Sequence, residues 1–211
     1  MTAKGYFFDF DGTLVDSMDP AIDALLGFLR ERGVRYPENI VEIMLPLGYK
    51  GIASYFSDAF GIDGTPEKIY AELIDRLTRV YAYTVGGNLG VGPVLHRLKK
   101  QGAKLYVLTG SPKEFFLPCL QRLGWYSLFD GCWSVADFGL TKADPELFRT
   151  VADTVGLPCA ECVMVDDSMQ SLRTARSVGM KTVGVYDKYS RQDETKMRSF
   201  VDKYIYDFTQ F

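Results

Sequence analysis

The chain has 211 residues, of which 47% are hydrophobic and 24% are charged, a composition that supports a buried core and argues against disorder. Its 24 Lys and Arg residues against 27 Asp and Glu residues give a formal net charge of -3 without a long basic stripe, so nucleic acid is not expected as a partner. No apolar stretch is long enough to span a bilayer, and the first strand begins too early to follow a signal peptide. We therefore expect a cytoplasmic protein with no membrane partner.

The first predicted element is an apolar strand near residue 6 that ends in two carboxylates. Alternate residues of a strand share a face, so Asp9 and Asp11 can turn toward one point while Phe8 and Phe10 pack. Gly12 permits a tight turn after the strand, and we expect the Thr13 hydroxyl to cap the segment that follows. The simplest alternative is a solvated strand end before a turn. If the pair forms a site, its carboxylates could bind a cation, accept a phosphoryl group covalently, or do both.

Residues 17–85 have helical patterns and almost no strand. A helix start is predicted at 17–20 and a stop at Gly33, and a second helix is expected to begin at Thr65 and Pro66. Helices inserted after the first strand of an α/β sheet predict a separate unit. We therefore expect an all-helical cap domain at 17–85 and a core domain formed by 1–16 and 86–211.

In the second half of the chain, apolar strand-like runs alternate with amphipathic helices. Strands are predicted at 104–108, 162–165 and 181–185. Helices are predicted from Val91 to a stop at Gly102, and from Asp144 to a stop at Gly156. Pro118 is expected to delay, kink or break the helix that follows residue 111. The alternation predicts an α/β fold, with a Rossmann-like parallel sheet and helices on both faces.

The four cysteines, Cys119, Cys132, Cys159 and Cys162, suggest ordinary intracellular thiols and not a disulfide framework. The pair at 159 and 162 forms a lone CxxC. A zinc site would need a second pair of ligands, and His96 lies far away within a helical pattern. We therefore interpret these thiols as buried or loop residues.

Polar residues follow the ends of the predicted strands, where open parallel α/β sheets bind their ligands. Lys142 lies on a loop that could reach the same edge. The candidate site residues are Asp9, Asp11, Thr109, Gly110, Lys142, Asp166 and Asp167. Each has an ordinary alternative, such as a turn, a solvated charge or a helix cap, but their joint position in an alternating chain favours a site.

Charge repulsion among four carboxylates at one edge requires cations. Two unit charges 4 Å apart repel by about 4 kcal/mol at an effective dielectric constant near 20. Lys142 would supply one positive charge, and a hard divalent ion with oxygen ligands would supply two more. Magnesium fits the ligand type and its usual role beside phosphate.

The order of these motifs resembles that of the haloacid dehalogenase-like hydrolases. The four motifs are those at 9–13, at 109, at 142–145 and at 165–168. The helical segment after the first motif is similar to the C1-type cap of the subgroup that contains phosphoglycolate phosphatase-like and β-phosphoglucomutase-like enzymes. The resemblance covers nearly the whole chain.

The resemblance implies a catalytic role for each motif residue. Asp9 would be the nucleophile that forms an aspartyl-phosphate, and Asp11 the general acid and base. Thr109 and the backbone N–H of Gly110 would hold the phosphoryl oxygens. Lys142 would balance the negative charge of the nucleophile and the phosphate.

The resemblance also implies a magnesium site. Asp167 would bind Mg²⁺ together with Asp9 and the backbone carbonyl of Asp11. Many relatives carry a second acid four residues after the aspartate that corresponds to Asp167, and this chain has Ser171 at that position. Asp166 is therefore the candidate for the second carboxylate near the metal, bound directly or through water.

A magnesium-dependent phosphatase acting on a small phosphomonoester is the leading hypothesis. A phosphomutase is an alternative, although Thr13 stands where β-phosphoglucomutase-like sequences often have an aliphatic residue. A dehalogenase is disfavoured because those relatives lack the second aspartate, which is present here as Asp11. Outside the enzymes, Asp9 could be phosphorylated as a signalling switch, but response regulators carry their acidic pair before the acceptor and lack a helical insert.

The expected partner is a small phosphorylated metabolite, selected by the inserted helices. Segment 47–51 resembles the specificity loop of such caps, so Lys50 is the first cation of the cap to test as a substrate ligand. A solvated lysine is the alternative. We expect a monomer or a weak homodimer.

Overall fold

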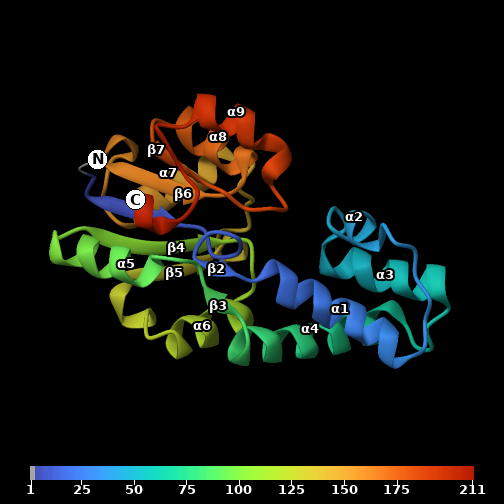
Figure 1. The fold of residues 1–211 in the computed structure, drawn as a ribbon. Helices are drawn as coiled ribbons and strands as arrows, with labels where there is room; N and C mark the ends of the chain where they lie inside the picture. Colours follow the sequence, from blue (N-terminus) through green and yellow to red (C-terminus); the bar gives the residue numbers. More distant parts are fainter. Residues whose placement is uncertain (1–2) are drawn as a thin grey trace. The chain divides into compact units, whose positions relative to one another are not determined.

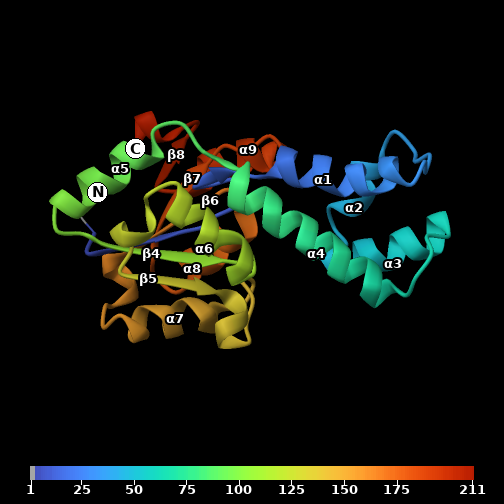
Figure 2. The same ribbon diagram turned by 90° about the horizontal axis from the view of Figure 1, so that it is seen from below.

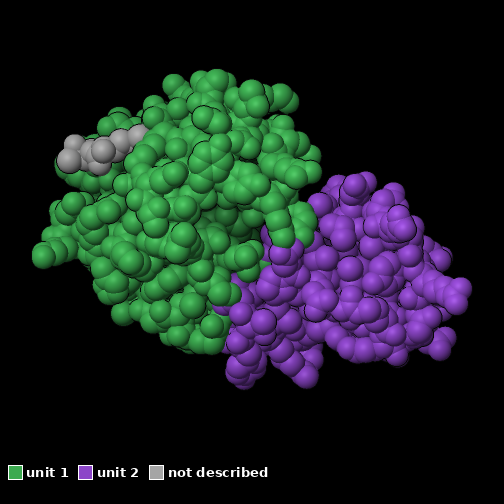
Figure 3. Space-filling view, in the orientation of Figure 1, with its two compact units in different colours: residues 1–17, 86–211 green, residues 18–85 purple. Residues whose placement is uncertain are grey.

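The computed structural model describes residues 3–211, which fold into two compact units (Figures 1 and 3). The first unit contains the chain up to residue 17 together with residues 86–211, and the second contains residues 18–85. Within the described residues, no helix combines the length and the apolar character needed to cross a membrane.

The first unit is built on a parallel sheet of six strands in the order β5-β4-β1-β6-β7-β8. The strands are β1 (Gly5–Phe8), β4 (Lys104–Thr109), β5 (Gly131–Ser134), β6 (Cys162–Asp166), β7 (Lys181–Val185) and β8 (Lys203–Ile205). A separate antiparallel ribbon pairs β2 (Val15–Asp16) with β3 (Gly86–Gly87). Because β1 lies between β4 and β6, the residues that follow these three strands meet at one edge of the sheet.

Helices cover both faces of this sheet (Figures 1 and 2). Helices α5 (Val91–Lys100) and α6 (Lys113–Arg122) lie on one face, and α7 (Pro145–Thr154), α8 (Met169–Ser177) and α9 (Glu194–Phe200) lie on the other. Phe7 and Leu108 of the sheet pack with Phe148 and Leu172 in one buried cluster. The predicted Rossmann-like α/β fold is therefore confirmed.

Five short 3₁₀ helices complete the first unit. They are η1 (Tyr126–Leu128), η2 (Val135–Phe138), η3 (Cys159–Glu161), η4 (Arg191–Asp193) and η5 (Phe208–Gln210). The η4 helix follows the carboxyl end of β7 and belongs to the loop that connects this strand to α9.

The second unit contains only helices among its regular elements. They are α1 (Met18–Glu31), α2 (Ile40–Met44), α3 (Gly48–Phe60) and α4 (Pro66–Tyr83). The rings of Phe28 and Phe56 stack at 5.9 Å in its core, and Arg32, which directly follows α1, forms an ion pair with Glu72 of α4. The Thr65 hydroxyl accepts a hydrogen bond from the N–H of Lys68, so the predicted start of α4 is confirmed.

The structure corrects two local predictions. Of the three effects expected of Pro118, the structure contradicts the break, because helix α6 runs from Lys113 to Arg122 with Pro118 inside it. Four buried side chains fix this helix to the core, which offsets the hydrogen bond that proline cannot donate. Thr13 caps no helix, because α1 begins only at Met18 and the Thr13 hydroxyl donates to Asp167 instead.

Candidate active site

Three strand ends bring the sequence-predicted residues of the first unit to one edge of the sheet. Asp9 directly follows β1, and its N–H donates to the carbonyl of Val165, which extends the pairing of β1 with β6. Thr109 is the last residue of β4 and Asp166 is the last residue of β6. The register of the sheet therefore gathers residues that are up to 157 positions apart, from Asp9 to Asp166.

Three carboxylates lie close together at this edge. One oxygen from each of Asp9, Asp166 and Asp167 lies within 4.8 Å of the others. The ammonium of Lys142 lies 2.5 Å from Oδ1 of Asp9 and 2.8 Å from Oδ2 of Asp166. One positive charge thus faces three carboxylates, and a hard divalent cation would fit both the oxygen donors and the remaining negative charge.

The electrostatic environment shifts the pKa values of this group. Burial raises the pKa of Asp9 to about 7, and the carboxylates of Asp166 and Asp11 add to this increase against the opposing effect of Lys142. Burial, followed by repulsion from Asp166 and Asp9, also raises the pKa of Asp167. Burial alone would lower the pKa of Lys142, but Asp166 and Asp9 raise it above its usual value, so Lys142 stays protonated.

Asp166 is fully buried, and both of its carboxylate oxygens accept hydrogen bonds. Oδ1 accepts from the N–H of Ser168 at 2.8 Å. Oδ2 accepts from the hydroxyl of Ser171 at 2.6 Å and from the ammonium of Lys142 at 2.8 Å. Ser171 therefore supports Asp166, and Asp166 in turn orients Lys142.

Asp11 lies outside the group of three carboxylates and is held by hydroxyls. The Ser17 hydroxyl donates to its Oδ1 at 2.6 Å, and the Ser111 hydroxyl donates to its Oδ2. The N–H of Ser111 donates in turn to the hydroxyl oxygen of Thr109 at 3.0 Å. This chain of contacts connects the Asp11 side chain to the loop after β4.

The remaining predicted residues have different surroundings. Gly110 is exposed directly after β4, and a side chain there would meet nothing within 4 Å. Lys50 is exposed in the first turn of α3, in the second unit, so the segment expected to be a loop is helical from Gly48 onward.

Sequence reasoning missed the hydroxyl groups around these carboxylates and the tight packing of Gly12. The hydroxyls belong to Thr13, Ser17, Ser111, Ser171 and Ser190. The backbone of Gly12 has a φ of 69°, and a Cβ there would lie 3.1 Å from the Asp167 carboxylate. A glycine after the second aspartate was a recognisable signal, whereas isolated serines on loops carry no motif.

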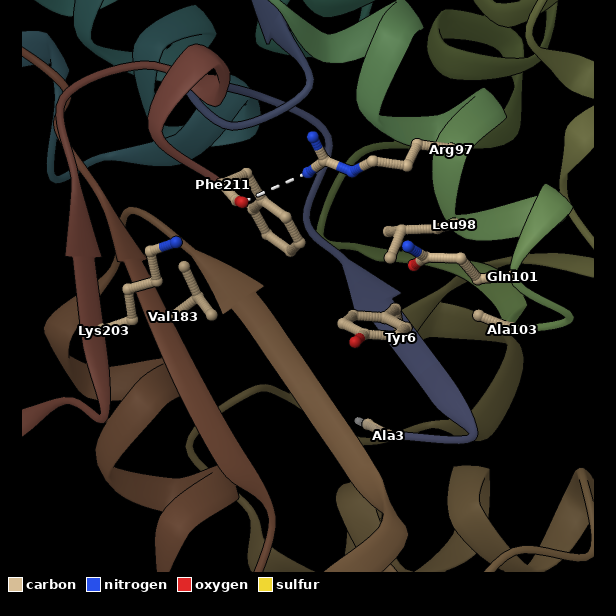
Figure 4. Close-up of a pocket in the computed structure, with 9 residues that line it drawn as sticks. All are labelled: Ala3, Tyr6, Arg97, Leu98, Gln101, Ala103, Val183, Lys203 and Phe211. Carbon is tan, nitrogen blue, oxygen red and sulfur yellow. Dashed lines mark hydrogen bonds between the residues drawn. The ribbon is translucent and has the colours of Figure 1, made fainter. Parts of the chain in front are cut away.

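A separate cavity of about 700 Å³ lies away from this group (Figure 4). Ala3 precedes β1, Ala103 precedes β4 and Lys203 begins β8, so the cavity is near the amino ends of the strands. The Arg97 side chain points toward Phe211 and donates to its backbone oxygen at 3.1 Å. None of the predicted catalytic residues lines this cavity, and the site at the carboxyl ends does not depend on it.

Comparisons with known proteins identify the family and the fold of this chain. A family model described as haloacid dehalogenase-like hydrolase matches residues 3–179. The chain is 28% identical over 192 residues to a phosphoglycolate phosphatase of Psychrobacter arcticus, covering 87% of this chain and 83% of the relative. It is 23% identical over 180 residues to a phosphorylated carbohydrates phosphatase of Thermotoga maritima, covering 85% of this chain and 83% of the relative. The crystal structure of CbbY from Rhodobacter sphaeroides in complex with phosphate is similar with a TM-score of 0.80 at 19% identity, covering 99% and 96%.

Proposed function

The chain belongs to the haloacid dehalogenase-like hydrolases, and on that basis we propose that it hydrolyses small phosphomonoesters with Asp9 as the nucleophile. The observation that carries the proposal is the contact of the Lys142 ammonium with both Asp9 and Asp166, beside a third carboxylate at the carboxyl edge of the sheet. The names of two relatives, a phosphoglycolate phosphatase and a phosphorylated carbohydrates phosphatase, support the class of reaction.

Magnesium is the cation that we propose for this site. Asp9, Asp167 and the backbone carbonyl of Asp11 would hold it, with Asp166 nearby. When bound, Mg²⁺ would neutralise negative charge on the phosphoryl group and on the surrounding carboxylates. The donor set supports this choice because carboxylate and carbonyl oxygens suit a hard cation, and because Lys142 compensates only part of the negative charge.

In the first half of the proposed reaction, a carboxylate oxygen of Asp9 attacks phosphorus. The bond from phosphorus to the substrate oxygen breaks, and protonated Asp11 gives its proton to the leaving alkoxide. Thr109 and the N–H of Gly110 would hold the phosphoryl oxygens, and Lys142 would orient Asp9 and offset the charge.

In the second half, water attacks the aspartyl-phosphate while Asp11 accepts a proton from that water. The bond from phosphorus to Asp9 breaks, which releases inorganic phosphate and restores the carboxylate. The hydroxyls of Ser17 and Ser111 support this exchange because they can stabilise the ionised form of Asp11 between the two steps.

The helical residues 17–85 are proposed to be the cap that selects the substrate, and residues 1–16 with 86–211 the catalytic core. The substrate class is a small phosphorylated metabolite. Lys50 is the proposed cation of the cap for a charged group of the substrate, and its exposure to solvent supports its availability. Screening phosphorylated metabolites and ranking them by kcat/KM would identify the substrate.

An assay with a generic aryl phosphate tests the proposed reaction. The purified protein is expected to release inorganic phosphate when Mg²⁺ is present, to lose this activity when a chelator is added, and to regain it when Mg²⁺ is restored in excess. Absence of turnover with every phosphomonoester and divalent cation tried would contradict the proposal. A sugar 1-phosphate that gives an isomer in place of inorganic phosphate would indicate a phosphomutase.

Magnesium is expected to raise the melting temperature more at about pH 8 than at about pH 5. The folded-state pKa of Asp9 is about 7, and that of Asp167 is also above its usual value. In the metal-free protein, the stability that Asp9 contributes is therefore complete below its unfolded pKa and is lost as the pH rises through about 7, and the contribution of Asp167 changes in the same direction. Metal binding favours the deprotonated carboxylates and reverses this loss.

Thermal unfolding with and without Mg²⁺ measures the effect, with a monovalent salt at matched ionic strength as the control. Equal stabilisation at both pH values would show that these carboxylates do not hold the ion.

A further inference from the structure

The loop after β7 reaches the proposed metal site. Pairing of β6 with β7 places Gly184 beside Asp166, so the loop that follows Val185 leaves the sheet next to Asp167. From this loop, the hydroxyl of Ser190 donates to Oδ2 of Asp167 at 2.8 Å. The contact joins two segments that are 23 residues apart in the sequence.

Local hydrogen bonds hold Ser190 in place. Its N–H donates to the carbonyl of Asp187 at 3.1 Å, and its own carbonyl accepts from the N–H of Asp193 at 3.0 Å. The Asp187 carboxylate also accepts from the N–H of Tyr189 at 2.8 Å, which closes the same turn a second time. Because both backbone groups of Ser190 are engaged within the loop, its side chain is presented to Asp167 from a defined position.

Asp167 is contacted on its other side by the turn after β1. The Thr13 hydroxyl lies 3.3 Å from Oδ1, and Gly12 lies so close that a Cβ there would be 3.1 Å from the carboxylate. The Ser190 bond is shorter than the Thr13 bond and has the usual length of an O–H···O hydrogen bond. Ser190 therefore makes the closer of these two hydroxyl contacts to Asp167.

We propose that Ser190 is a positioning residue that sets the orientation of the Asp167 carboxylate and thereby the affinity of the site for Mg²⁺. The inference rests on the proposed function, because Asp167 is the proposed metal ligand. Residues that hydrogen-bond to metal ligands commonly change metal affinity by about 10-fold to 100-fold when they are removed. The Ser190 side chain donates to Asp167, so its effect would pass through that carboxylate.

Three variants test the proposal. Ser190→Ala removes the hydroxyl, Ser190→Thr retains it, and Ser199→Ala is the matched control, since the exposed Ser199 hydroxyl donates only to the Lys196 carbonyl of its own helix. Calorimetry measures the binding of Mg²⁺ to each substrate-free protein. Kinetics with an aryl phosphate measure the Mg²⁺ concentration that gives half-maximal rate, and KM at saturating Mg²⁺.

Ser190→Ala is expected to weaken Mg²⁺ binding by about 10-fold and to raise the half-maximal Mg²⁺ concentration equally, with little change in KM. Ser190→Thr and Ser199→Ala should bind Mg²⁺ like the unmodified protein. If Ser190→Ala does not fold, Ser190→Cys, with its much weaker donor, should show the same loss. If the unmodified protein binds Mg²⁺ and hydrolyses the aryl phosphate, an unchanged Mg²⁺ affinity in Ser190→Ala would overturn the proposed role of Ser190 and leave the proposed function standing. Failure of the unmodified protein to bind Mg²⁺ or to turn over would overturn the proposed function as well.

Discussion

Replacing Asp9 by Asn is expected to lower kcat for phosphomonoester hydrolysis by about 10⁴-fold or more. The amide has nearly the same shape as the carboxylate, but it lacks the anionic oxygen that would attack phosphorus. Lys142 would still contact Asp166 in this variant, so the charge that faces the phosphate should remain. Steady-state kinetics with an aryl phosphate at saturating Mg²⁺ measure the loss.

Asp23→Asn provides the matched control for this variant. Asp23 is an exposed acid in α1 whose carboxylate pairs with Arg30, and its replacement should leave turnover unchanged. Brief reaction followed by acid quench should trap phosphate covalently on the unmodified protein and not on Asp9→Asn. Turnover of Asp9→Asn close to that of the unmodified protein would refute the assignment of Asp9 as nucleophile.

Replacing Asp11 by Asn is expected to lower kcat by about 10² to 10⁴-fold, the usual contribution of a general acid and base. The amide oxygen of asparagine can accept from one of the Ser17 and Ser111 hydroxyls, and its NH₂ group can donate to the other, so the local structure should persist. It has no titrating proton to give to the leaving alkoxide.

The loss should therefore depend on the leaving group. An alkyl phosphate, whose alkoxide needs a proton, should lose more activity than an aryl phosphate, whose phenolate leaves without one. Comparing the ratio of rates for the two substrates in Asp11→Asn and in the unmodified protein measures this difference. An equal loss for both substrates would contradict the role of Asp11 as general acid.

The edge at which these residues meet could be predicted because each buried strand ends in an abrupt change of polarity. β1 is followed by Asp9, and β4 and β6 end at Thr109 and Asp166, and in parallel sheets such ends converge. The short strands β5 and β8 could not be predicted in the same way. β5 has the sequence Gly-Cys-Trp-Ser and β8 the sequence Lys-Tyr-Ile, so each has only two apolar residues in a row, which does not distinguish it from a loop.

The hydrogen bonds of the site were beyond sequence reasoning. Ser17, Ser111 and Ser190 come from three separate loops or element ends, and only the fold reveals that each hydroxyl meets an acid. Thr13 illustrates the same limit, since a hydroxyl after a strand usually caps the next element and here meets a carboxylate 154 residues away. Local propensity describes neighbours in sequence, whereas these contacts depend on tertiary packing.

The ribbon of β2 and β3 bears on how such a molecule could change during evolution. Asp16 pairs with Gly86, so the chain departs from the sheet unit and returns to it at neighbouring positions. Because the two ends of the inserted segment already lie side by side, the sheet unit has no long loop to close. The entropic cost of lengthening the insertion therefore rises only slowly with its number of residues. The helical block can thus be enlarged, trimmed or exchanged for another over time while the carboxylates of the candidate site keep their places, a route by which one chemistry acquires new substrates.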